Sequence, residues 1–411
     1  MQKTNSRHAC LHSCLAALAL SIVLIILSTS LFGCRSPRRG LRAPGPITNL
    51  IKIGKGSFPK ISPDGRLIAY TKESADPNDP QGFGFEIYTM KPDGSHVTCL
   101  THDKEGVSNT RWRGQPYWHP SGNYIAFTAE SKEYPRKGNG TNARPGIGRN
   151  HNVWIMTADG SRFWQMTDYP DNWGVIRPSF SHDGKTLYWC EEFMMEEYPN
   201  GEPGDRPGPH PGSYWGRENI VFRKGEELGA WRVKTADISF ATGKPVISNI
   251  RHIDPPAGLT IIEGEGLMPD DEGFVYSYSS RANEGGRCFC GDIYTSDMNG
   301  KTLKNLTDTP GIHDENAEFS PDGSKIAWNH SVGYPGDKED LYLMDANGGN
   351  NVRLTYFGDP GHPEYDANAR QITESTWSPD GKFIVFGHVS DEREYGLGPH
   401  IPSDLYRLTF R

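Results

Sequence analysis

Residues 320 to 328 read Ser-Pro-Asp-Gly-Ser-Lys-Ile-Ala-Trp, a tight turn followed by a short apolar run. Proline presets one backbone dihedral of such a turn, aspartate can bond its own backbone, and glycine tolerates a positive φ. The apolar triplet Ile326-Ala327-Trp328 is too short and too aromatic for a helix, so we interpret it as a buried strand. The stretch therefore predicts a hairpin turn that leads into a β-strand.

The same unit occurs six times along the chain. The other five turns are Ser62-Pro63-Asp64-Gly65, His119-Pro120-Ser121-Gly122, Ser181-His182-Asp183-Gly184, Met268-Pro269-Asp270-Asp271 and Ser378-Pro379-Asp380-Gly381. An apolar triplet follows each of them, and a third strand is expected at residues 87–90, 153–156, 231–238, 293–296, 341–344 and 405–408. A second turn then leads to a fourth strand that often ends in Leu-Thr. Four antiparallel strands repeated six times predict an all-β protein, a six-bladed β-propeller of four-stranded blades.

The last unit ends after its third strand, and residues 46 to 53 match the missing fourth strand. We therefore expect the N-terminal strand to pair with residues 404 to 410 in the last blade. This pairing closes the ring and removes both open sheet edges.

The Ser-Pro-Asp-Gly turn, the Ile-Ala-aromatic strand and the Asp-Gly turn before Leu-Thr resemble the propeller repeat of TolB and related periplasmic proteins. The resemblance covers nearly all of the chain after residue 45 and implies the propeller fold. The same repeat occurs in binding modules, in propellers of prolyl oligopeptidase type and in oligogalacturonate lyases, so it implies no single function. The sequence has no Gly-x-Ser-x-Gly motif, so we expect no hydrolase domain of the prolyl oligopeptidase type.

The N-terminus resembles a bacterial lipoprotein signal. Lys3 and Arg7 precede an apolar run that ends in Leu31-Phe32-Gly33-Cys34. We expect residues 1–33 to be the signal peptide, Cys34 to be lipidated, residues 34–45 to be a tether and residues 46–411 to be the propeller. An uncleaved signal anchor is the alternative, because the apolar run is almost long enough to span a bilayer. Either reading predicts an exported, membrane-anchored protein on the periplasmic or cell-surface side.

The charge distribution argues against nucleic acid as a partner. The whole chain has a formal net charge of −8, and Lys3, Arg7 and the four tether arginines are all positive. The propeller itself is therefore more acidic than the whole chain, which disfavours a phosphate backbone. We expect an envelope protein or an acidic polysaccharide as partner, with the membrane reached through the N-terminal lipid.

The connections between the second and third strands are the long ones, and they all emerge on the face opposite the Pro-Asp-Gly turns. Long loops in a compact fold are commonly functional, so this loop-rich face is the expected binding surface. The candidate ligand-binding residues near it are Arg111, Trp112, Arg113, Tyr214, Trp215, Arg217, Arg281, His313, Asp314 and His362. Tyr214 and Trp215 beside Arg217 would suit a sugar ring and a carboxylate, whereas a polar lid is the simpler interpretation. The arginines of residues 111–113 could instead be structural partners of neighbouring acidic residues.

Histidines also gather in these loops. His313, His330, His362 and His388 are the candidate metal ligands, and a divalent metal is a possible cofactor. The resemblance to oligogalacturonate lyases, whose propeller face is His-rich and contains a metal, points the same way. No fixed short spacing such as His-Glu-x-x-His supports the site, and surface histidines are common.

These observations predict a lipid-anchored binding or scaffold propeller of the cell envelope that holds a protein or glycan on its loop-rich face. The alternative is a metal-assisted polysaccharide lyase acting on uronate-containing glycans. No residue can be assigned a catalytic role from the sequence.

Overall fold

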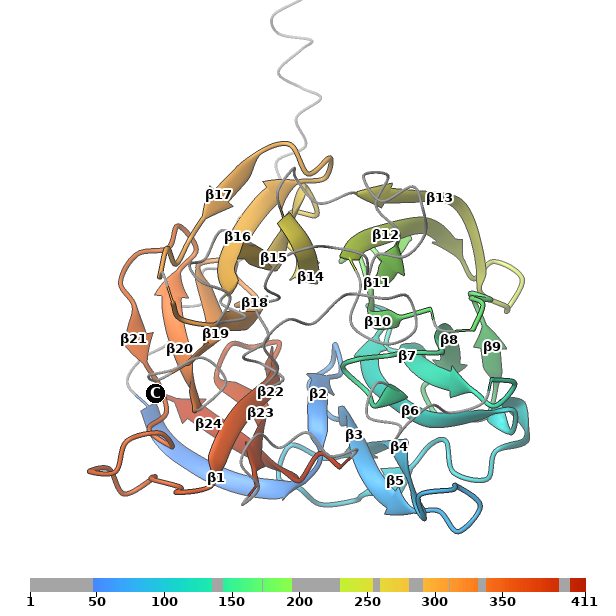
Figure 1. The fold of residues 1–411 in the computed structure, drawn as a ribbon, viewed down its shortest axis with the longest axis horizontal. Coiled ribbons are helices and arrows are strands. Elements are labelled where there is room, and N and C mark those ends of the chain that lie inside the picture. Colours follow the sequence, from blue (N-terminus) through green and yellow to red (C-terminus); the bar gives the residue numbers. More distant parts are fainter. Residues whose placement is uncertain are drawn as a thin grey trace, which may run out of the picture. The chain divides into compact units, whose positions relative to one another are not determined.

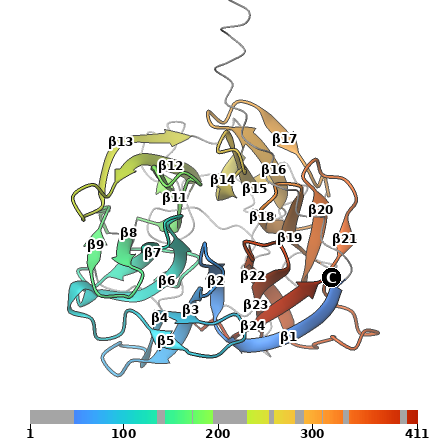
Figure 2. The ribbon, with the colours of Figure 1, turned by 180° about the vertical axis from the view of Figure 1, so that it is seen from behind.

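The computed structural model describes residues 47–134, 143–171, 173–193, 230–253, 259–280, 291–309, 311–331, 338–391 and 400–411. All of them belong to one compact unit, residues 42–411. Their strands form six four-stranded sheets arranged as blades around a central axis (Figures 1 and 2). The predicted six-bladed β-propeller is therefore confirmed.

The first three blades follow the chain from the innermost strand outward. Their strands are β2 (Ser57–Ile61), β3 (Ile68–Ala75), β4 (Phe83–Met90) and β5 (Thr98–Cys99), then β6 (Thr110–Trp118), β7 (Tyr124–Ser131), β8 (His151–Thr157) and β9 (Phe163–Gln165), then β10 (Val175–Phe180), β11 (Thr186–Phe193), β12 (Ala230–Ser239) and β13 (Val246–Ile253).

The other three blades continue in the same order. Their strands are β14 (Leu259–Leu267), β15 (Gly273–Ser280), β16 (Gly291–Asp297) and β17 (Leu303–Asn305), then β18 (Asp314–Phe319), β19 (Lys325–Ser331), β20 (Glu339–Asp345) and β21 (Val352–Arg353), then β22 (Ala369–Trp377), β23 (Phe383–Ser390), β24 (Ser403–Phe410) and β1 (Ile47–Lys55). The helical content of the described residues is one 3₁₀ turn, η1 (Glu105–Val107), and this part of the chain contains no helix long and apolar enough to cross a membrane.

The apolar triplets form the core, as their pattern predicted. All eighteen residues of the six triplets are at most 2% exposed. Their side chains pack against the next blade, as where Ala69 and Ile87 of the first blade meet Trp118 and Phe127 of the second. Because each blade buries one face against each neighbour, the core is spread around the whole ring.

The turn motif works as its chemistry suggests. In the fifth blade the Ser320 hydroxyl donates to the Asp322 carboxylate at 2.6 Å, and the Gly323 amide donates to the Ser320 carbonyl at 2.8 Å. Gly323 has φ of 73°, a conformation that costs a residue with a side chain more than it costs glycine.

The N-terminal strand closes the ring. β1 pairs with β24 in an antiparallel ladder that runs from Ile47 opposite Phe410 to Lys55 opposite Asp404. It is the outermost strand of the last blade, next to the C-terminal strand (Figure 1). The predicted closure is confirmed, and Ile53 is buried in it.

Candidate functional site

Every innermost strand contains a β-bulge at nearly the same place. The register with the second strand shifts in β2, β6, β10, β14, β18 and β22 alike. In four of these strands one non-glycine residue at the bulge has a positive φ between 51° and 58°: Phe58, Gln115, Arg177 and Asn316. Such bulges re-aim a side chain, and non-glycine residues with positive φ often mark functional positions. The repeated bulge makes the centre of the ring the place to look for a site.

Arg177 is the hub of this centre. Its guanidinium donates to Glu263 at 2.9 Å, to Asn316 at 2.5 Å and to Glu265, and it lies 3.6 Å from Glu374. Burial opposes the charge of Arg177, but the surrounding glutamates outweigh it and raise its pKa. Burial also raises the pKa of Glu265 to about 8, although Arg177 partly offsets the effect. The Glu265 carboxyl is therefore partly protonated at neutral pH.

A second buried cation extends the network across the ring. The Lys60 ammonium lies 2.7 Å from Glu318 and 3.6 Å from Glu374, and its pKa is raised by these two carboxylates despite burial. Gln115 donates to Glu374 at 3.4 Å. Side chains of all six innermost strands thus meet here, and the cavity left between them is only about 10 Å³. The network therefore links the six innermost strands.

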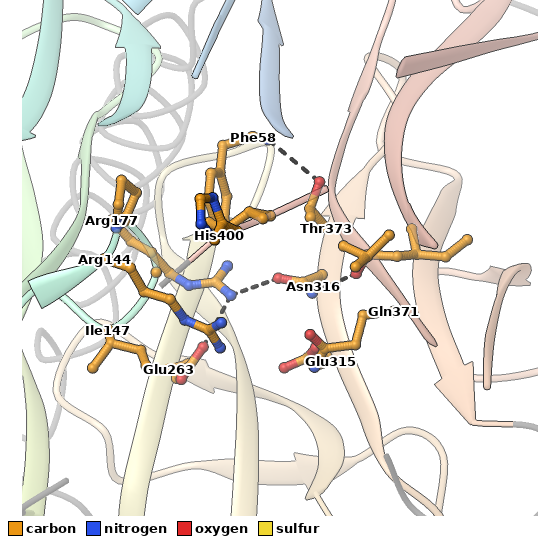
Figure 3. Close-up of a pocket in the computed structure, with 15 residues that line it drawn as sticks. Phe58, Arg144, Ile147, Arg177, Glu263, Glu315, Asn316, Gln371, Thr373 and His400 are labelled. Carbon is orange, nitrogen blue, oxygen red and sulfur yellow. Dashed lines mark hydrogen bonds and ion pairs between the residues drawn. The ribbon is translucent and has the colours of Figure 1, made fainter. Parts of the chain in front are cut away.

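A pocket with a cavity volume of about 100 Å³ lies against this network. Figure 3 shows Arg144, Arg177 and Glu263 on one side of it and Glu315, Asn316 and Gln371 on the other. Its remaining lining residues are Phe58, Pro145, Gly146, Ile147, Ile372, Thr373, Val389, His400 and Ile401. Residues 143–150 and 400–402 belong to connections between second and third strands, so the pocket opens on the predicted loop-rich face.

A larger open depression adjoins the pocket. It shares His400 and Ile401 with the pocket, and Lys55, Lys72, Glu73 and Asp391 are among its other lining residues, with a volume of about 640 Å³. His400 stacks on Phe83 with ring centroids 4.1 Å apart and hydrogen-bonds to Glu73 at 2.9 Å. Pocket and depression together are of the size that accommodates a small ligand.

Two of the lining carboxylates have shifted pKa values. Burial raises the pKa of Glu263, and Arg177 counteracts part of the shift. Burial also acts on Glu315, but His313 and Arg177 outweigh it and lower the pKa of that carboxyl. In return Glu315 and Glu339 overcome the burial of His313 and raise its pKa to about 9. Glu315 is therefore ionised at neutral pH, beside a protonated imidazole.

The three residues of the Arg-Trp-Arg motif lie in β6 and contact their own neighbours. Arg111 donates to Glu130 at 2.8 Å, and Arg113 donates to Glu86 at 2.7 Å. Trp112 is 1% exposed and packs against Phe83 and Phe85. None of the three lines the pocket described above.

The predicted histidines are distributed over different surroundings. His313 lies 3.2 Å from Glu315, whereas Nδ1 of His330 donates to the Asp314 carboxylate at 2.6 Å. Asp314 also accepts a hydrogen bond from the Trp328 indole at 2.8 Å. His362 stacks on Tyr356 with ring centroids 4.3 Å apart. The structure thus places Asp314 and His330 together, and His362 elsewhere.

His388 is buried and stacks on Phe357 with ring centroids 3.9 Å apart. Burial lowers its pKa to about 4, with only partial compensation from Asp366 and Asp404. In the unfolded chain the His388 imidazole has its ordinary pKa of about 6.5. As the pH falls, His388 is therefore protonated in the unfolded state before it is protonated in the folded state.

We expect this histidine to make folding less stable in mild acid. The folded-state pKa is depressed, so its contribution is intact above pH 6.5 and is lost as the pH falls from 6.5 toward 4. Between pH 7.5 and pH 5 the loss is about 2 kcal/mol. Urea unfolding of the wild type and of His388→Gln at both pH values measures it. Equal pH dependence of the two proteins would contradict the assignment.

The remaining candidates fall outside the described residues. These are Tyr214, Trp215, Arg217, Arg281 and the lipidation residue Cys34. Their predicted roles stay predictions.

The sequence interpretation did not select Arg144, Glu263, Asn316 or Gln371 for the site. The sequence contained a signal for two of them, because both are polar residues in innermost strands. Glu263 lies four residues before Leu267, and Asn316 lies three residues before Phe319, the apolar residues that directly precede the turns. Gln371 lies in β22, further from its turn. Arg144 lies in a long connection with no motif, so nothing in its neighbourhood pointed to the pocket.

No model of a known protein family matches the chain. Among curated proteins it is 25% identical to dipeptidyl-peptidase 5 of Porphyromonas endodontalis over 337 residues, which cover 75% of this chain and 42% of that protein. It is 26% identical to dipeptidyl-peptidase 5 of Porphyromonas gingivalis over 160 residues, which cover 36% of this chain and 21% of that protein. The chain therefore spans less than half the length of either relative.

Several solved structures follow a similar course of the chain. One, assigned to TolB of Agrobacterium tumefaciens, has 16% sequence identity and a TM-score of 0.43. The match covers 88% of this chain and 91% of the TolB chain. An oligogalacturonate lyase of Vibrio parahaemolyticus has 11% identity and a TM-score of 0.47, covering 89% and 98%. The neighbours of this six-bladed β-propeller thus include both TolB-like and oligogalacturonate lyase propellers.

Proposed function

We propose that this protein is a lipid-anchored binding propeller of the cell envelope that holds a glycan in the pocket of its loop-rich face. The observation that carries the proposal is the set of groups in the pocket wall. Arginine, carboxylate, amide and hydroxyl groups surround one small cavity, with the rings of Phe58 and His400 beside them.

This combination suits the chemistry of sugars. Each hydroxyl of a sugar both donates and accepts a hydrogen bond, so neighbouring donors and acceptors satisfy it. Carboxylates accept, guanidinium groups donate, and amides such as those of Asn316 and Gln371 do both. An aromatic ring adds apolar contact with the face of the sugar ring. The adjoining depression offers room for further sugar units.

Export and anchoring through Cys34 belong to the proposal as well. They rest on the signal sequence and the arginine-rich tether, both in residues 1–45. The anchor would be detected as lipid attached to Cys34 by mass spectrometry of the protein purified from membranes.

Binding to a panel of neutral and uronate-containing oligosaccharides tests the glycan proposal. Gln371→Ala is expected to weaken the binding of the recognised oligosaccharide by roughly 3- to 10-fold, the value of one hydrogen bond. His182→Ala is the control, because His182 belongs to a turn on the opposite face and is 52% exposed in its side chain. The proposal fails if no oligosaccharide binds at millimolar concentration, or if both variants weaken binding equally.

A polysaccharide lyase is the second candidate function. The observation that favours it is the contact of His313 and Glu315 at the pocket, where a base could act on a bound uronate. The same oligosaccharide panel distinguishes it, because a lyase produces unsaturated products that absorb ultraviolet light. A peptidase function, to which the name of the two relatives points, is not proposed, because the match leaves more than half of each relative uncovered.

A further inference from the structure

Three side chains with metal-binding groups converge behind the pocket wall. His313 precedes β18, Glu315 lies in β18, and Glu339 begins β20. One ligand atom from each lies within 4.8 Å of those of the other two. His313 and Glu339 are 1% exposed, and the side chain of Glu315 is 13% exposed. Among the described residues this group contains one of the four histidines that the sequence suggested as metal ligands.

Glu339 supplies an independent sign that a ligand belongs here. Its Oε2 accepts the backbone amide of Ile372 at 3.0 Å, which fixes the carboxylate in place. Its Oε1 is buried and has no hydrogen-bond partner in the described part of the chain. A buried carboxylate oxygen without a partner is costly and uncommon. A bound cation would satisfy it.

We propose that His313, Glu315 and Glu339 bind one divalent transition-metal cation, Mn²⁺ or Zn²⁺. An imidazole nitrogen with two carboxylates is a donor set that both ions accept. The cation takes the place of the imidazole proton and balances the charge of the two glutamates.

Glu315 connects the proposed metal site with the pocket. Glu315 is both a member of the group and a lining residue of the pocket. Three protein ligands leave at least one coordination position open, as in metal sites that bind a substrate or ligand. Because Glu315 also lines the pocket, the cation would lie next to it, and a hydroxyl or carboxylate of the bound molecule could occupy an open position. The cation site itself does not depend on the proposed glycan function.

Calorimetric titration of the chelator-treated full-length protein with MnCl₂ and, separately, ZnCl₂ tests the site. We expect one cation per chain for at least one of the two metals. Glu339→Gln and His313→Ala should each weaken binding by at least 10-fold. His362→Ala is the matched control, because His362 stacks on Tyr356 and is not part of the group.

Two further measurements distinguish a loss of metal binding from misfolding and from any effect on glycan binding. Thermal unfolding of the metal-free variants checks their fold, and Glu315→Gln replaces any variant that does not fold. The electron paramagnetic resonance spectrum of bound Mn²⁺ provides a second readout that needs no glycan. Absence of stoichiometric binding overturns the proposal, as does equal binding by the wild type and Glu339→Gln or equal loss in His362→Ala.

Discussion

Replacing Arg177 by methionine is expected to lower the free energy of unfolding by about 3–5 kcal/mol. Methionine approximates the length of arginine but leaves the carboxylates of Glu263, Glu265 and Glu374 without their shared cation. Removing one partner of a buried ion pair costs this much because the remaining charge stays buried and uncompensated. Urea unfolding at pH 7 measures the loss.

The same substitution at an exposed ion pair is the control for Arg177→Met. Arg251 lies 3.0 Å from Asp237, and the two side chains are 59% and 44% exposed. Arg251→Met should therefore cost less than about 1 kcal/mol. Adding Glu265→Gln to Arg177→Met should recover part of the lost stability, because it removes a buried carboxyl group that has lost its cationic partner. A loss below 1 kcal/mol for Arg177→Met would show that the network does not hold the inner strands together.

Deleting residues 43 to 53 is expected to lower the melting temperature by roughly 5–10 °C, corresponding to a loss of about 3–5 kcal/mol. The deletion exposes the outer edge of β24, whose backbone groups pair with β1. It also removes Ile53 from its buried position, which alone is worth about 1.5–3 kcal/mol. Differential scanning calorimetry gives the midpoint.

A shorter deletion separates ring closure from the loss of the residues that precede β1. Removing residues 43 to 46 leaves β1 intact and should leave the melting temperature within 1–2 °C of the wild type, as expected for changes outside packed structure. If the longer deletion also leaves it unchanged, the ring is stable without β1, and the strand has no role in closure.

The role of the closing strand could be predicted from the sequence, whereas the role of Arg177 could not. The closing strand was predictable, because residues 46 to 53 match a strand that the last repeat lacks. Arg177 was visible only as one arginine among several. Arg111 and Arg113 have the same charge and also lie in an innermost strand, yet they pair with Glu130 and Glu86 and not with the central carboxylates. Arg177 occupies the positive-φ position of its strand, with φ of 54°, whereas in β6 the corresponding position is Gln115, with φ of 52°.

The candidate metal group shows the same limit. His313 and Glu315 are two residues apart, and the sequence singled out His313. Glu339 had no such neighbour, since it enters the group only through the pairing of β20 with β19, which in turn pairs with β18. His362 and His388 were expected to join, but one stacks on Tyr356 and the other on Phe357.

The sequence alone was sufficient for the six blades, their four strands, the closing strand and the face that bears the long connections. These features follow from turn chemistry and strand patterns that involve residues within about ten positions of one another. The same pattern occurs in six copies along the chain, which strengthens the prediction. Only the tertiary structure decided which charged residues meet at the centre and which atoms line the pocket. Ion pairs and pockets form between side chains that are distant in sequence, and a bulge of one residue turns a side chain from the sheet toward the axis.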